Sequence, residues 1–64
     1  MNEMELNAVV NWEDGDGKKH TGVLADDCGH FLALRNFEDG IDEVPLSMVV
    51  SAVNPNGKVI RPNE

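Results

Sequence analysis

Residues that break regular structure recur at short intervals along this 64-residue chain, and they constrain its fold more than any other feature. Clusters of Gly, Asn, Asp and Pro stand at residues 13–18, 26–29, 38–40 and 54–57, separated by apolar or alternating segments. Such segments are too short for stable helices but suit strands, and Asp-Gly and Asn-Gly pairs favour tight hairpin turns. The pattern therefore predicts an all-β domain of short strands.

Three strands are expected in the first part of the chain. Residues 6–12 alternate with period two, as in a half-buried strand. Residues 20–26 form the second strand, in which Gly22 has no side chain to pack and marks a bend or a bulge. Residues 30–37 form the third and longest, apolar on both faces, which indicates a central strand covered twice, with a partner subunit as one way to cover it. The expected faces carry Leu6, Ala8, Val10 and Trp12 in the first strand, and Leu32 and Leu34 opposite Phe31, Ala33 and Phe37 in the third.

Shorter strands are expected in the second part, at residues 41–44, 49–53 and 58–61. Pro45 cannot donate to a ladder and ends the fourth strand, and residues 46–48 fit one turn of 3-10 helix before the last core strand. Five or six short strands in up-and-down order close most economically into a small barrel, which removes exposed edges. The whole chain, residues 1–64, is expected to form this single domain.

Charge and composition argue against several functions. Twelve acidic residues stand against five Lys and Arg, a net charge of −7, so direct binding of nucleic acid is not expected. Cys28 is the only cysteine, which excludes an internal disulfide and favours the reducing cytoplasm. The first ten residues lack the basic and apolar regions of a signal peptide, and no apolar run is long enough for a membrane span.

No catalytic, cofactor or metal site is expected. Cys28 with His20 and His30, even with Asp26 and Asp27 nearby, lacks the paired spacing of structural zinc ligands. The same two carboxylates disfavour a thiolate at Cys28, which a nucleophile would need. A domain this small cannot enclose a pocket that buries most of a substrate. The sequence therefore predicts a protein that is not an enzyme.

The order of strands and turns resembles the Sm-like (Lsm/Hfq-type) family over residues 8–55. The likeness runs through VVNWEDG at 9–15, GVL at 22–24, the acidic pair at 26–27, the apolar strand at 31–37 and VPLSMVVSAV at 44–53. It implies a small barrel, and for the RNA-binding members an oligomeric ring. The chain has EVPL at 43–46 where those members carry a basic and aromatic signature. Tudor and other SH3-like barrels share much of the same alternation, and FEDGIDEV at 37–44 suits either class.

The acidic turns supply the candidate binding residues. Alternate turns of a meander emerge at the same end of a sheet. The acidic clusters at 13–16 and 38–43 should therefore lie together, at the end opposite Asp26 and Asp27. That arrangement would attract a basic partner, for example a nucleic-acid-binding protein whose site the carboxylates occupy. Arg35, alone among the apolar residues of the third strand, would add an interface contact. The candidate partner-binding residues are Glu13, Asp14, Asp16, Arg35, Glu38, Asp39, Asp42 and Glu43.

Three functions follow from these observations. The first is a non-catalytic acidic protein-interaction module or inhibitor that binds a basic partner. The second is an Sm-like oligomeric protein that binds RNA, and the third is an SH3-like or Tudor-like reader of basic peptides. The sequence leaves open whether the chain forms a homo-oligomer and whether the acidic loops bind a partner or only confer solubility.

Overall fold

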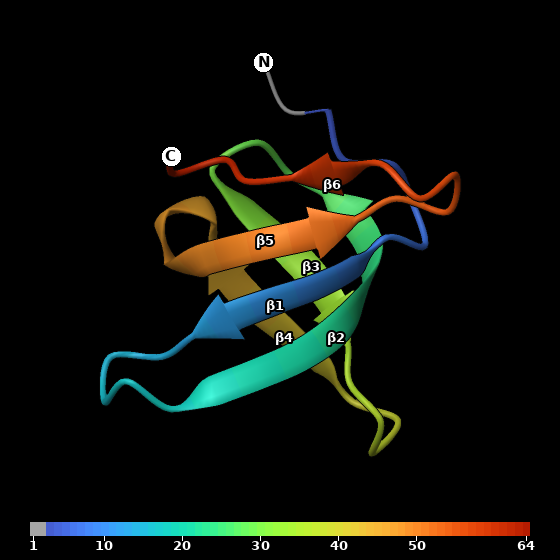
Figure 1. The fold of residues 1–64 in the computed structure, drawn as a ribbon. Coiled ribbons are helices and arrows are strands. Elements are labelled where there is room, and N and C mark those ends of the chain that lie inside the picture. The colour runs from blue at the N-terminus through green and yellow to red at the C-terminus, as the bar shows by residue number, and fades with distance from the viewer. Residues whose placement is uncertain (1–2) are drawn as a thin grey trace.

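A computed structural model describes residues 3–64 and contains six antiparallel strands in one curled sheet (Figure 1). The all-β class and the 3-10 turn before the later strands are confirmed. The predicted domain of residues 1–64 includes Met1 and Asn2, which lie outside the described residues. The elements are β1 (Val9–Glu13), β2 (Lys19–Asp27), β3 (Phe31–Arg35), β4 (Ile41–Pro45), the 3-10 turn Leu46–Met48, β5 (Val49–Val53) and β6 (Val59–Ile60).

The strands follow the order β4-β3-β2-β1-β5-β6 in the sheet. The first four pair in up-and-down order, and β5 then returns to pair with β1 instead of β4. In that pairing Val9 faces Val53 and Val10 faces Ala52. β1 lies between β2 and β5 in this order. The sheet is curled, so that β3 and β4 cross behind β1 and β5 in Figure 1. The inner faces of the two halves therefore enclose one core.

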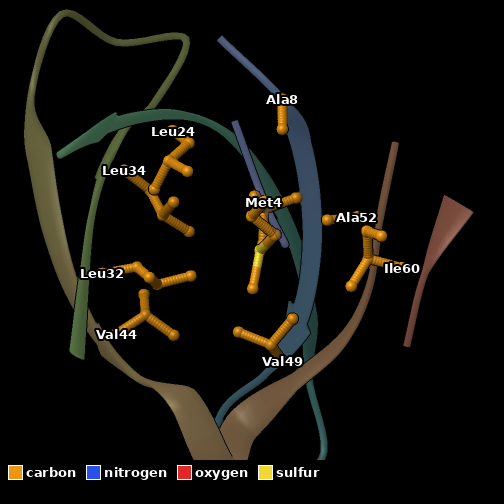
Figure 2. Close-up of a cluster of buried hydrophobic side chains, with 10 residues drawn as sticks. Met4, Ala8, Leu24, Leu32, Leu34, Val44, Val49, Ala52 and Ile60 are labelled. Carbon is orange, nitrogen blue, oxygen red and sulfur yellow. The ribbon is translucent and has the colours of Figure 1, made fainter. Parts of the chain in front are cut away.

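Inward side chains from both halves of the sheet fill this core. Figure 2 shows Met4 between two groups, with Leu24, Leu32, Leu34 and Val44 on one side and Ala8, Val49, Ala52 and Ile60 on the other. Of the two apolar faces expected for the third strand, the one with Leu32 and Leu34 is fully buried, while Phe31 and Ala33 on the other are half-buried. Each buried leucine contributes about 1.5–3 kcal/mol of hydrophobic stabilisation.

The side chain of Asn54 holds the segment that carries Met4. Its Oδ1 accepts a hydrogen bond from the Glu5 N–H (2.9 Å), and its Nδ2 donates to the Glu3 carbonyl (3.0 Å). Asn54 is only 3% exposed, so both bonds are made in surroundings where an unpaired amide would be costly. These two bonds therefore keep Met4, which is 8% exposed, inside the sheet.

The chain before β1 differs from the prediction. The strand expected from residue 6 begins at Val9, and Leu6, expected to face inward, is 57% exposed. Asn7 adopts the left-handed conformation (φ 73°), which its short polar side chain tolerates, and the Ala8 N–H donates to the Glu5 carbonyl. This turn interrupts the alternation, so the inward face starts at Ala8.

The bulge predicted at Gly22 lies further along β2. Gly22 stands in regular register opposite Val10, and the irregularity in the pairing with β3 falls between Leu24 and Asp26. A Cβ on residue 22 would lie 3.1 Å from the Cβ of Leu34. The missing side chain at Gly22 therefore leaves room for a core leucine and does not mark a bulge.

The third strand is shorter than predicted. It ends at Arg35, and Phe37, expected on an apolar sheet face, is 77% exposed in the following turn. Asn36 ends the strand because its Oδ1 accepts the N–H groups of Glu38 and Gly40, both at 2.9 Å. The turn thus carries Phe37 out of the sheet and into solvent.

Replacing Asn54 by Ala should lower the free energy of unfolding by about 2–3 kcal/mol, because two hydrogen bonds are lost and their backbone partners are left partly buried. Urea denaturation at neutral pH measures the change. Asn56→Ala is the matched control, since the Asn56 side chain accepts one exposed bond from the Lys58 N–H. Equal losses in the two variants would contradict the role given to Asn54.

Candidate binding site at the acidic end of the sheet

Side-chain oxygens of Asp and Asn build the turns between strands. Each accepts a backbone N–H two residues further along the chain, which shapes the turn and fixes where the neighbouring side chains emerge. The residues that do so are Asp14 for Asp16, Asp27 for Gly29, Asn36 for Glu38 and Asn56 for Lys58. The turns at 13–18 and 36–40, which carry predicted binding residues, are therefore held in defined positions.

Asp14 also fixes the ring of His20. Its Oδ2 lies 2.8 Å from the His20 Nε2, while its Oδ1 accepts the N–H groups of Asp16 and Lys18. The His20 ring stacks on Trp12, with centroids 4.3 Å apart and planes at 19°. Trp12, expected on the inward face, is half-buried and packs against the margin of the core. Asp14, His20 and Trp12 thus form one ordered unit at the end of β1 and β2.

These bonds keep the Asp14 carboxylate charged. The hydrogen bond with His20, followed by that from the Lys18 N–H, lowers the pKa of Asp14 below its usual value of 3.8. A negative charge therefore stays beside His20 at neutral pH.

His20 also lines an open hollow of about 240 Å³. Phe37 borders it, and Asn36 Nδ2 donates to Asp42 Oδ2 (3.2 Å), which orients that carboxylate. Residues from β2 and from the turn between β3 and β4 thus meet at one place. We call this site the acidic hollow, and its lining residues are His20, Thr21, Asn36, Phe37, Glu38 and Asp42.

A second hollow, of about 370 Å³, opens beside Trp12 over β1, β2 and β5. Its polar side chains bond to one another: Thr21 Oγ1 donates to Asn11 Oδ1 (2.9 Å), and Asn11 Nδ2 donates to Ser51 Oγ (3.3 Å). Glu13 stands opposite Lys19 in the β1–β2 register. This hollow therefore presents less uncompensated negative charge than the acidic hollow does.

The structure brings part of the predicted binding set together. Asp14 reaches the acidic hollow through His20, and Glu38 and Asp42 line it directly. Glu13 and Asp16 flank Asp14 in the chain. Asp39 lies in the turn beside Glu38, with φ 64°. His20 thus bonds to a carboxylate of the first turn and lines the same hollow as Glu38 and Asp42.

Glu43 lies apart from this group. It stands beside Ala33 in the β3–β4 register, and Asp26 stands beside Ala33 on the β2 side. Its charge acts on Cys28, whose thiol pKa is raised by desolvation and then by Asp26, Asp27 and Glu43. The sequence places Asp26 and Asp27 at this thiol, and their effect has the predicted direction.

Arg35 occupies a row of outward-facing apolar side chains. The strand registers place it between Val23 and Ile41. The same row continues across the sheet through Val9, Val53 and Val59, which are about two-fifths exposed. Arg35 is therefore a charged residue within a partly apolar outer surface, away from the carboxylates of the acidic hollow.

Within residues 3–64, no three His, Cys, Asp or Glu side chains gather as ligands of a metal ion would. In the same part of the chain, no helix has the length and apolar character needed to cross a bilayer. Comparisons with protein-family models, curated proteins and solved structures found no match to this chain. The resemblance to Sm-like and SH3-like barrels stays a prediction.

Four residues of the acidic hollow were not among the predicted binding residues: His20, Thr21, Asn36 and Phe37. His20 follows Asp14 across a tight turn, a spacing that can bring both side chains to one hairpin end. Phe37 directly follows Asn36, a residue type that favours turns, and this was the available signal that Phe37 leaves the strand.

The lowered pKa of Asp14 predicts that the charged form of this carboxyl stabilises the fold. A carboxyl whose folded pKa lies below its unfolded value stabilises the fold above the unfolded pKa, and this contribution is lost as the pH falls through the folded pKa. The Asp14→Asn variant should therefore have a lower Tm than the wild type at neutral pH, and the difference should shrink between about pH 5 and pH 2. Asp16→Asn, in the same turn, is the control. Melting curves that keep a constant separation over this range would contradict the prediction.

Proposed function

We propose that the protein is a non-catalytic interaction module that binds a basic protein segment at the acidic hollow. The observation that carries this proposal is Phe37, an aromatic side chain left 77% exposed beside the carboxylates of Glu38 and Asp42. An aromatic face and carboxylates together attract a Lys or Arg side chain, through cation–π attraction and ion pairing.

The site is partly ordered before a partner arrives. Asn36 orients Asp42, and Asp14 together with Trp12 orients His20. Binding to ordered side chains costs less conformational entropy than binding to free ones. The net charge of −7 adds long-range attraction that speeds encounter with a basic partner.

We further propose that the curled sheet is a small barrel of the Sm-like or SH3-like kind that stays open between its outer strands, β4 and β6. The return of β5 to β1 supports this, and so does Asn63, whose Nδ2 donates to the carbonyls of Leu46 (2.9 Å) and Val49 (2.8 Å). These bonds join the chain end after β6 to the segment after β4. An SH3-like or Tudor-like reader of basic peptides would use the same acidic hollow. Carboxylates at this site repel phosphate, so an RNA-binding ring is not the function we propose.

Fluorescence polarisation with labelled decalysine tests the proposed function. Phe37→Ala and Glu38→Gln should each weaken binding by about threefold to tenfold at moderate salt, through loss of the cation–π contact or of one carboxylate. Asp26→Asn removes the same charge from another turn and should change binding by less than about twofold. A labelled oligonucleotide should not bind.

Two outcomes would contradict the proposed function. Equal weakening in Glu38→Gln and Asp26→Asn would mean that only net charge matters. Unchanged affinity in Phe37→Ala would remove the aromatic contact on which the site depends.

A further inference from the structure

One long edge of the sheet has no strand beside it. β4 pairs with β3 on one side, and no described strand pairs with its other side. The Asn36 N–H donates to the Gly40 carbonyl and the Leu46 N–H to the His30 carbonyl, one at each end of this ladder. Bonded positions alternate along an antiparallel pair, so Asp42 and Val44 turn their backbone groups toward β3. Ile41 and Glu43 therefore turn theirs outward.

We propose that the basic partner binds as an added strand along this edge of β4. Its backbone would bond to the outward N–H and C=O groups of Ile41 and Glu43, in the manner by which extended peptides extend exposed sheet edges. This inference rests on the proposed function, because it specifies how a basic segment is held. Pro45 has no N–H and limits the added pairing to a few residues.

Charge decides which strand can occupy the edge. Asp42 and Glu43 lie at the centre of β4, and opposite charges across a strand pair are favourable while like charges are not. A second copy of the chain would bring Asp42 against Asp42, or Glu43 against Glu43, in the antiparallel registers that overlap the strand most. The edge therefore opposes pairing with β4 of a second copy and favours a strand with basic side chains.

The side chains of β4 also predict a sequence pattern for the partner. The segment from Ile41 to Val44 reads apolar, acidic, acidic, apolar, and Ile41 is 57% exposed. The complementary strand has two adjacent basic residues between two apolar, β-branched ones.

The edge is continuous with the acidic hollow. β4 begins directly after the turn at residues 36–40 that carries Phe37 and Glu38, and Asp42 belongs both to β4 and to the hollow. A segment lying along β4 can therefore place a further basic side chain beside Phe37.

Two N-methylated isomers of the peptide TVKKVT test the strand geometry on the unmodified protein. Each isomer carries methyl groups on alternate residues, so one loses the N–H groups that face β4 and the other loses those that face away. Isothermal titration should show that one isomer binds about tenfold or more weakly than the parent and the other within about twofold. Equal losses in the two isomers would overturn the proposal.

Glu43→Pro and Glu43→Gln supply the matching test on the protein. Both remove the charge, but only Pro removes the outward N–H, which takes no part in the β3–β4 ladder. The Pro variant should bind TVKKVT about threefold or more weakly than the Gln variant while circular dichroism shows the same sheet content. Equal affinities of two folded variants would overturn the proposal, and if the Pro variant does not fold, the peptide isomers decide.

The two proposals fail in different ways. If Phe37→Ala weakens TVKKVT binding while the two N-methylated isomers bind alike, the edge proposal is wrong and the proposed function stands. If neither decalysine nor TVKKVT binds, both are wrong. If sedimentation shows that the chain dimerises and that Glu43→Pro abolishes the dimer, the edge is occupied by a second copy and the edge proposal is wrong.

Discussion

The fold depends on one buried amide that ties the segment before β1 to the turn between β5 and β6. Asn54 bonds to the backbone on either side of Met4 and so holds a core side chain that belongs to no strand. A chain of 64 residues buries only about 60% of the surface that it exposes when unfolded, less than a larger domain buries, so every core side chain matters for stability. Without Met4 the space between the leucines of β2 and β3 and the small side chains of β1 and β5 would lack its central occupant. The curl of the sheet, and hence the meeting of its turns, depends on that occupant.

The acidic residues of this protein serve the fold as well as the surface. Asp14 uses one oxygen to build its turn and the other to hold His20. Asn36 uses its oxygen to end β3 and its nitrogen to orient Asp42. The bonds that make the hairpins are therefore the same bonds that arrange the carboxylates around the hollow.

Local patterns predicted the strands at 41–44 and 49–53 and the 3-10 turn between them, because Pro45 and the flanking apolar runs fix these boundaries within a few residues. Period two likewise placed Leu32 and Leu34 on one face of the third strand, but it did not show which face is the core because both faces are apolar. Features that depend on distant parts of the chain could not be read in this way. The pairing of β5 with β1 joins residues about forty positions apart, and the bonds by which Asn54 holds the Met4 segment span about fifty.

The candidate site shows the same division between local and distant effects. The sequence grouped the acidic turns by chain order, which places Asp14, Glu38 and Asp42 near one another but also includes Glu43. Within β4, however, successive side chains point to opposite faces, so Asp42 joins the hollow while Glu43 faces the side of Asp26 and Cys28. Phe37 was missed as a site residue because the alternating pattern of the third strand continues through residue 37. The turn formed by Asn36, which takes Phe37 out of the strand, is not visible in that pattern.

We propose that the negative charge of this protein is gathered into a defined binding surface. The most direct measurement is a ¹⁵N–¹H correlation spectrum recorded during titration with decalysine. Shift changes should concentrate at His20, at residues 36–38 and at residues 41–43. Changes of equal size at acidic residues far from the hollow in the sequence, Asp26, Asp27 and Glu64, would show that the peptide binds the charged surface as a whole and that no defined site exists.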